Sequence, residues 1–137
     1  MSTLIDTNIL IDIYQPGSEW EAWSASRLEE AFVAGPVFIN QIVAAEIAPE
    51  FTTVEKHEAA LKATFISRED IPWQAAFLAG KAHRDYRSSR GMRERILPDF
   101  IIGAHAVVRG HTLLTRDARR YRTYFPELDI IAPDTHP

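Results

Sequence analysis

The sequence predicts an α/β protein with a central, mostly parallel sheet and helices on both faces. Short apolar runs at 4–5, 37–39, 112–114 and 130–131 alternate with longer segments whose apolar residues recur at helical spacing. Strands that alternate with helices form parallel sheets, because each helix carries the chain back to the edge where the previous strand began. A chain of 137 residues supports one core, so residues 1–137 are expected to form a single domain.

Residues that begin and end helices set the expected helix boundaries. We expect helices directly after Asp6 and at 19–33, 41–48, 55–63, 73–90 and 98–108. Asn40 is a candidate N-cap, and Gly91 and Gly110 are expected to end two of the helices. Residues 65–66 fit either a strand or simple packing.

Apolar positions on these helices predict the packing. Four positions of the helix at 73–90 are expected to face the core: Ala76, Phe77, Gly80 and His83. Three aromatic residues are expected in the core, with any exposed part suited to a protein partner: Trp20, Trp23 and Phe32. Four histidines are expected to be packing or surface residues, because no two stand at ligand spacing near the candidate acids described below: His57, His83, His105 and His111.

Charge is divided unevenly along the chain. The formal net charge is -4, but residues 1–80 have 12 acidic and 4 basic residues, whereas residues 81–137 have 7 acidic and 11 basic residues. The basic half is compatible with a polyanionic partner. Cysteine is absent, which excludes disulfides and thiolate metal sites within the chain. No apolar run approaches ~18 residues and no secretory signal is visible, so we expect a cytoplasmic protein without membrane contact.

Two aspartates directly follow predicted strands. Asp6 ends the first apolar run, and Asp117 follows the run at 112–114 after a hydroxyl residue, Thr115, and an arginine. The carboxyl ends of parallel strands are where open α/β sheets bind ligands. The alternative for Asp6 is a turn or capping residue without a chemical role, since aspartate is common at such junctions.

Two further acids lie on predicted helices. Glu46 has apolar neighbours on its helix, and burying an unpaired carboxylate there is costly, so the sequence indicates a role other than that of a solvated surface residue. The alternative is a glutamate at the helix edge that reaches water. Asp99 lies in the first turn of the helix at 98–108, where the helix dipole alone favours an acid. Small residues on the face of Asp99, Gly103 and Ala106 would let that helix approach the sheet closely.

Four carboxylates at one edge of a sheet require a cation, because like charges a few ångströms apart raise one another's pKa. The four candidates offer only oxygen ligands, which select Mg²⁺ or Mn²⁺ over zinc: Asp6, Glu46, Asp99 and Asp117. Such ions activate water and stabilise the leaving oxygen of a phosphodiester. Thr115 and Asn8 are candidate residues for orienting these carboxylates or positioning water.

Each acid belongs to a short motif, and the four motifs occur in order along the chain: LIDTNILID, INQIVAAEI, PDFIIGAHA and LLTRDARRY. Together they resemble the motifs of PIN-domain ribonucleases, particularly the VapC toxins of toxin–antitoxin modules, over nearly the whole chain. The resemblance implies a PIN-like three-layer sandwich and a Mg²⁺- or Mn²⁺-dependent endoribonuclease. It implies that Asp6, Glu46, Asp99 and Asp117 form the catalytic acidic cluster, with Thr115 beside it.

The same resemblance implies partners. Family members act on RNA, usually form homodimers, and are inhibited by a cognate antitoxin that reaches toward the acidic site. The arginines at 84–95 and 116–122 would hold the RNA backbone, so activity is expected to fall with salt.

Three other classes of protein are compatible with acids at the edge of a parallel sheet. A phosphorelay receiver domain requires a lysine on a late strand, and no lysine follows Lys81. A nucleotide-binding enzyme requires a glycine-rich phosphate loop, and the six scattered glycines supply none. The alternative that stays open is a non-catalytic PIN-like domain that only binds RNA or a protein partner.

Overall fold

The computed structural model of the chain describes residues 1–90 and 96–137. Within these residues lies a sheet of five strands in the order β3-β2-β1-β4-β5, and every neighbouring pair is parallel. The strands are β1 Thr3–Ile5, β2 Val37–Ile39, β3 Ser67–Arg68, β4 Thr112–Leu114 and β5 Ile130–Ile131. The predicted parallel α/β sheet is therefore confirmed.

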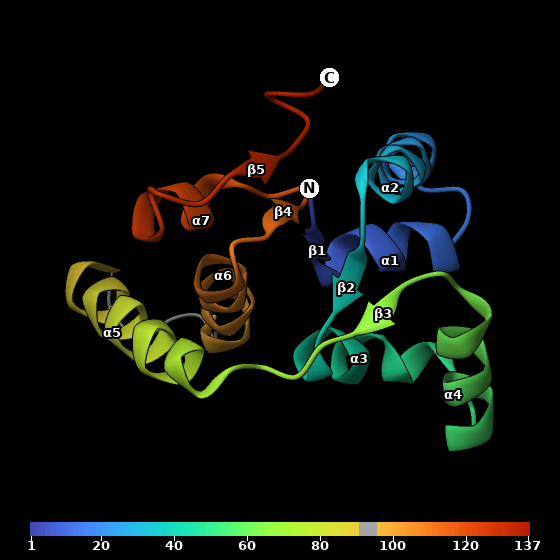
Figure 1. The fold of residues 1–137 in the computed structure, drawn as a ribbon, viewed down its shortest axis with the longest axis horizontal. Coiled ribbons are helices and arrows are strands. Elements are labelled where there is room, and N and C mark those ends of the chain that lie inside the picture. The colour runs from blue at the N-terminus through green and yellow to red at the C-terminus, as the bar shows by residue number, and fades with distance from the viewer. Residues whose placement is uncertain (91–95) are drawn as a thin grey trace.

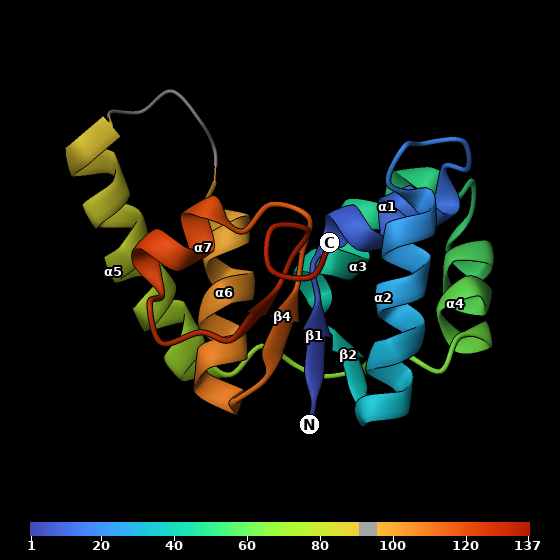
Figure 2. The same cartoon turned by 90° about the horizontal axis from the view of Figure 1, so that it is seen from above.

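Helices cover both faces of this sheet. The helices are α1 Thr7–Tyr14, α2 Glu21–Ala34, α3 Gln41–Ile47, the 3₁₀ helix η1 Ala48–Glu50, α4 Val54–Ala63, α5 Trp73–Arg90, α6 Leu97–Arg109 and α7 Arg119–Tyr124. Helices α1 and α2 lie on one face, and α5 and α6 lie on the other (Figures 1 and 2). No helix among the described residues is long and apolar enough to cross a membrane.

Strand β1 is the centre of the sheet, with β2 on one side and β4 on the other. Its residues Leu4 and Ile5 are fully buried, which explains why this short run is entirely apolar. Because all strands point the same way, Asp6 and the residues that follow β2 and β4 meet at one edge of the sheet. Figure 2 shows α1, the start of α6 and α7 gathered at that edge.

Helix α5 faces the core differently from the sequence prediction. Its buried side chains include Ala75, Ala79 and Ala82, whereas Phe77 is 73% exposed and Ala76 is also exposed. Small residues face inward because α5 packs along α6, and alanines let two helices approach closely. The prediction is therefore wrong for Ala76, Phe77 and Gly80, which are all exposed.

Smaller differences concern the helix ends and one strand. The strand near 65–66 is β3 Ser67–Arg68, and Phe65 is 89% exposed. The helix predicted at 41–48 continues past Ile47 as η1, in which Pro49 occupies an early position that needs no backbone N–H. The expectations for Gly91 and for the arginines at 93 and 95 lie outside the described residues.

Gly103 on α6 marks a close approach, but its neighbour is α7 rather than the sheet. A Cβ atom at this position would lie 2.7 Å from the Phe125 ring and 3.0 Å from the Tyr121 ring. Both rings are nearly inaccessible to solvent. Because Gly103 has no side chain, α7 and Phe125, the residue that follows it, pack against α6. Asp99 lies in the first turn of the same helix.

We predict that Gly103→Ala lowers the free energy of unfolding by about 1–3 kcal/mol, because the methyl group overpacks a filled core. Gly80→Ala is the matched control: it also lies inside a helix, but a Cβ there has no neighbour within 4 Å. That change is expected to stabilise the protein by about 0.5–1 kcal/mol through helix propensity. Urea unfolding of both variants measures the difference, and equal effects would contradict the proposed packing role of Gly103.

Candidate active site

The four predicted acids line one pocket of about 290 Å³ at the carboxyl edge of the sheet: Asp6, Glu46, Asp99 and Asp117. Each comes from a different part of the fold. Asp6 and Asp117 follow β1 and β4, Glu46 lies on α3, and Asp99 lies in the first turn of α6. The structure therefore brings together all of the acids that the sequence singled out.

Asp6 lies at the centre of this site and is only 5% exposed. It also caps α1, because its Oδ1 accepts a hydrogen bond from the Thr7 backbone N–H at 2.7 Å. Its Oδ2 accepts hydrogen bonds from the Thr115 hydroxyl at 2.7 Å and from the Tyr121 hydroxyl at 3.0 Å. Burial nevertheless raises the pKa of Asp6, although these three donors act in the opposite direction. The capping role and a chemical role are thus compatible in one residue.

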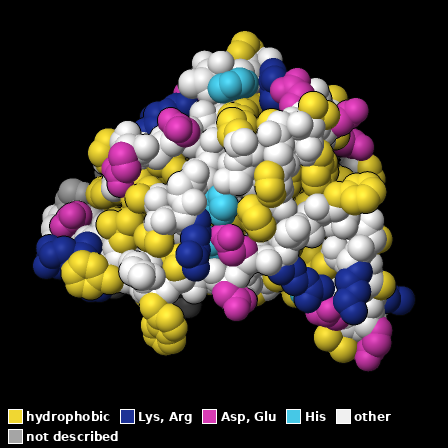
Figure 3. Space-filling model, viewed as in Figure 1, with side chains coloured by type: hydrophobic (Ala, Val, Ile, Leu, Met, Phe, Trp, Pro, Cys, Tyr) yellow, Lys and Arg dark blue, Asp and Glu magenta, His cyan; other side chains and the backbone are white. Residues whose placement is uncertain are grey.

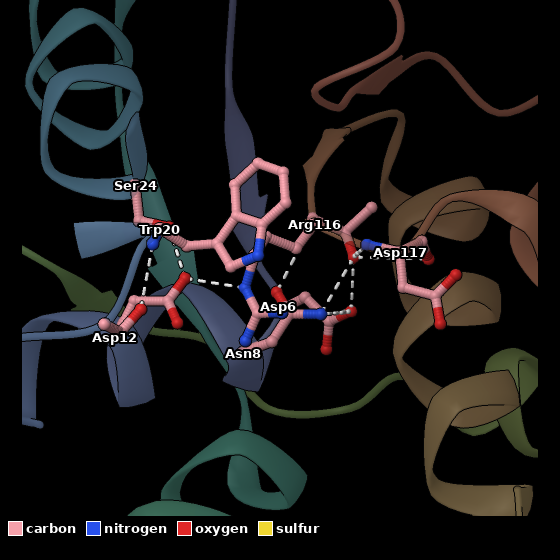
Figure 4. Close-up of polar contacts among 9 residues, drawn as sticks. Asp6, Asn8, Asp12, Trp20, Ser24, Arg116 and Asp117 are labelled. Carbon is pink, nitrogen blue, oxygen red and sulfur yellow. Dashed lines mark hydrogen bonds and ion pairs between the residues drawn. The ribbon is translucent and has the colours of Figure 1, made fainter. Parts of the chain in front are cut away.

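Thr115 is fully buried and does not line the pocket. Its hydroxyl oxygen accepts a hydrogen bond from the Asp117 backbone N–H at 3.1 Å while its proton goes to Asp6. Asn8 adds a donor 3.3 Å from the same oxygen, and its Oδ1 accepts from the Arg116 backbone N–H at 3.1 Å. These contacts tie the turn after β4 to the start of α1 (Figure 4). Thr115 is a positioning residue in this geometry.

Glu46 is exposed, contrary to the expectation of an apolar surrounding. Its Oε1 accepts a hydrogen bond from the Thr7 hydroxyl at 2.7 Å, which turns the carboxylate toward Asp6. The apolar neighbours that the sequence indicated, Val43 and Ile47, are buried on another side of α3. The prediction that Glu46 joins the acidic site agrees with the structure, but the argument from burial was wrong.

Asp99 is a second carboxyl in the pocket whose pKa is raised. Burial, followed by the charge of Asp6, raises its pKa to about 6, and the nearby Arg120 lowers it. Arg120 donates to Asp99 Oδ2 at 3.0 Å. The arginine therefore compensates only part of the repulsion that Asp99 experiences.

Tyr121 is a site residue that sequence reasoning missed. Its side chain is 2% exposed, and it lines the acidic pocket. Burial raises the pKa of Tyr121 well above its usual value, so its hydroxyl keeps the proton that it donates to Asp6. A tyrosine on an apolar helix face gives no sequence signal for such a contact, because the contact depends on how α7 packs.

The donor set of this pocket fits a hard divalent cation. Its candidate ligands are carboxylate oxygens, and the raised pKa values of Asp6 and Asp99 report that negative charge is held here at a cost. A cation among these oxygens would lower both pKa values and relieve that cost.

A second group of ligand-type side chains lies outside the acidic pocket. The Nε2 atoms of His105 and His111 both contact Glu69 Oε1, at 2.8 and 2.7 Å. The three groups are close enough together to hold a metal ion, and none of them lines the acidic pocket. Neither histidine lines the pocket of the four acids. The sequence did not predict that both contact Glu69.

Asn40 determines which ring nitrogen of His105 carries the proton. Asn40 caps α3 by accepting from the Val43 backbone N–H, so its NH₂ group faces His105 Nδ1 at 3.0 Å. This hydrogen-bond network assigns Nδ1 as an acceptor and Nε2 as the protonated nitrogen that donates to Glu69. Burial also lowers the pKa of His105. A metal ion on Nε2 would move the ring proton to Nδ1 and set two donors against each other, so the geometry favours a hydrogen-bonded structural cluster.

Comparison with known proteins identifies the fold. Similar solved structures include VapBC2 from Rickettsia felis bound to a promoter DNA fragment, with a TM-score of 0.71 and 20% identity, covering 96% of this chain and 98% of that chain. FitAcB from Neisseria gonorrhoeae has a TM-score of 0.70 and 18% identity, covering 98% of this chain and 99% of that one. A toxin–antitoxin complex from Klebsiella pneumoniae has a TM-score of 0.65 and 23% identity, covering 96% and 97%. At these identities the likeness shows the fold.

Family membership follows from the sequence itself. No curated protein sequence matches the chain. The profile of the PIN domain family matches residues 3–126, a span that includes all four acids and every helix. This agrees with the resemblance noted from the four motifs, and the chain belongs to the PIN domain family.

Proposed function

We propose that this protein is a Mg²⁺- or Mn²⁺-dependent endoribonuclease that acts as the toxin of a toxin–antitoxin pair. The PIN domain family consists of nucleases. The observation that supports this function best is the convergence of Asp6, Glu46, Asp99 and Asp117 on one pocket. Carboxylate oxygens bind the divalent ions that activate water and stabilise the leaving oxygen in phosphodiester hydrolysis.

These four carboxylates would hold the ion, and Thr115 and Tyr121 would fix the orientation of Asp6. When bound, Mg²⁺ supplies a Lewis acid for the scissile phosphate and lowers the pKa of water. Tyr121 and Thr115 both donate to the same oxygen of Asp6, so its Oδ2 is already oriented before the substrate arrives. Arg116 and Arg120 also line the pocket and place positive charge near a bound phosphate.

RNA is the proposed substrate because arginines line this acidic pocket and the pocket that adjoins it, among them Arg116, Arg119 and Arg120. The exposed arginines among the described residues include Arg84 and Arg87 on α5 and Arg119 on α7. The carboxylates alone repel a polyanion, so these arginines and the ion together would make RNA binding favourable. Binding through phosphates falls as salt rises.

The antitoxin, a homodimer and a cytoplasmic location are proposed as parts of this function. The similar structure from Klebsiella pneumoniae is a toxin–antitoxin complex by name. Exposed apolar surface suited to a protein partner lies on α5, where Trp73 is 90% and Phe77 is 73% exposed. Figure 3 shows hydrophobic side chains standing out over this helix. This surface differs from the one expected at Trp20, Trp23 and Phe32.

We predict that the purified protein cleaves single-stranded RNA in Mg²⁺ or Mn²⁺ and not in EDTA. Asp6→Asn and Asp117→Asn are each expected to lower the rate by about 10²-fold or more, the scale for removing a group that stabilises the transition state. Asp129→Asn is the matched control, because Asp129 is exposed and precedes β5 at the opposite edge of the sheet. Equal cleavage by all four proteins would indicate a contaminant. RNA binding without cleavage in any of these ions would favour the non-catalytic domain.

A second prediction concerns stability without metal. Asp99 has a pKa of about 6 in the folded state against 3.8 for the free side chain, so between these pH values the folded protein binds more protons than the unfolded chain. Its contribution to stability therefore falls as pH rises from about 4 through 6. In EDTA, the wild type should lose melting temperature over this range relative to Asp99→Asn, and Mg²⁺ at pH 7.5 should restore it in the wild type. If the melting temperatures of the two proteins differ by the same amount at every pH, the raised pKa of Asp99 is contradicted.

A further inference from the structure

A second pocket adjoins the acidic one and has no role in the mechanism above. Its volume is about 500 Å³, and its lining includes Trp20, Arg116, Arg119 and Arg122. Arg116 and Asp117 line both pockets, so the two are continuous at these residues. A chain bound across the acidic pocket would therefore extend into a space with arginines and an aromatic ring on its walls.

Arg116 is held in place by buried groups. Its Nε donates to Asp12 Oδ2 at 2.7 Å, and Asp12 is a helix residue only 3% exposed. The same oxygen accepts from the Ser24 hydroxyl at 2.6 Å, which links α1 and α2 to the turn after β4. The guanidinium carbon lies 5.8 Å from the centre of the Trp20 ring. Figure 4 shows these side chains together beside Asp6 and Asn8.

This arrangement leaves part of Arg116 available for a ligand. Its Nε is used by Asp12, while no hydrogen bond from its two Nη atoms to the rest of residues 1–90 and 96–137 is seen. A guanidinium fixed on one side by a buried carboxylate loses little freedom when it binds, and its remaining donors match the oxygens of a phosphate. Asp12 is buried and the Arg116 side chain is 29% exposed, and removing the Asp12 carboxylate from water is costly, so stability alone does not explain this pair.

The other arginines differ in their availability. Arg122 is paired with Asp134 through both Nη atoms. Arg119 is exposed and has no ion pair within the described part of the chain, so its charge adds to the pocket without compensation. The pocket therefore combines one fixed fork of donors, one uncompensated positive charge and one aromatic wall.

We propose that this second pocket binds the nucleotide next to the scissile phosphate in single-stranded RNA. Its phosphate lies against Arg116 and Arg119, and its base packs against Trp20. Arginine donors beside an aromatic ring are the chemistry that recognises single-stranded nucleic acid, whose bases are free to pack against protein. The proposal rests on the nuclease function, because it takes the acidic pocket as the place of the scissile phosphate.

The dependence of RNA binding on salt distinguishes phosphate contacts from stacking contacts in this pocket. Loss of a phosphate contact weakens RNA binding and lowers the dependence on salt, by about 0.7 in the slope of log K against log salt for a single strand. Loss of a stacking contact weakens binding by about tenfold and leaves this slope unchanged. The first is expected for Arg119→Ala and the second for Trp20→Leu. Arg116→Lys keeps the charge, so it is expected to weaken binding through its lost donors and to leave the slope unchanged.

The test is fluorescence anisotropy with a labelled, random-sequence RNA of twelve nucleotides, in Ca²⁺, across a salt series. Arg116→Lys keeps a cation beside the buried Asp12 and removes only the fork of donors, so folding is preserved. Arg68→Ala is the matched control: it removes the same charge from an exposed arginine that pairs with Glu58 and lines neither pocket. It should bind like the wild type, whereas Arg119→Ala should bind about tenfold more weakly.

The outcomes distinguish this pocket from the nuclease function. If the wild type cleaves RNA in Mg²⁺ but Arg119→Ala, Arg116→Lys and Trp20→Leu all bind like Arg68→Ala, the pocket is not a nucleotide site and the nuclease function stands. If the three variants bind weakly with the expected slopes while the wild type never cleaves, the pocket stands and the nuclease function fails. Absence of RNA binding by the wild type would overturn both.

Discussion

Repulsion among four carboxylates at one edge of the sheet is the constraint on which the rest of the site depends. The parallel sheet creates it, because strands β1 and β4 both deliver an acid at their carboxyl ends and the start of α6 adds Asp99. Burial of Asp6 strengthens it, since a buried carboxylate interacts with its neighbours through less water. Burial first, and the neighbouring carboxylates second, raise the pKa values of Asp6 and Asp99. Four clustered carboxylates destabilise the fold when no cation is present, whereas they are the ligands that a hard cation requires.

Hydrogen bonds from distant parts of the chain hold the central carboxylate in place against this repulsion. Asp6 accepts from Thr115 and Tyr121, which lie more than 100 residues further along the sequence. The same turn after β4 presents Arg116, which a buried carboxylate on α1 holds at the boundary between the acidic pocket and its basic neighbour. The turn after β4 thus orients Asp6 through Thr115 and also presents the donors of Arg116 to the second pocket.

Much of the fold and the site was accessible from the sequence, for a physical reason. Strands such as β2 and β4 are short apolar runs bounded by polar residues, and residues that follow parallel strands must meet at one edge, so Asp6 and Asp117 were found by position alone. The inward face of α5 was predicted wrongly, because apolar residues occur on more than one side of this helix and only its packing against α6 selects Ala75, Ala79 and Ala82. Tyr121 and the Arg116–Asp12 pair were missed because each joins segments whose contact depends on how α7 and the turn after β4 pack.

The most direct test of this account is Mn²⁺ binding followed by electron paramagnetic resonance, in the wild type, Asp6→Asn and Glu69→Gln. If the cation belongs in the acidic pocket, Asp6→Asn should lose most of the bound Mn²⁺ and Glu69→Gln should bind like the wild type. If Glu69→Gln loses the ion and Asp6→Asn keeps it, the cation belongs to the cluster of Glu69 with His105 and His111, and the proposed role of the four carboxylates is contradicted.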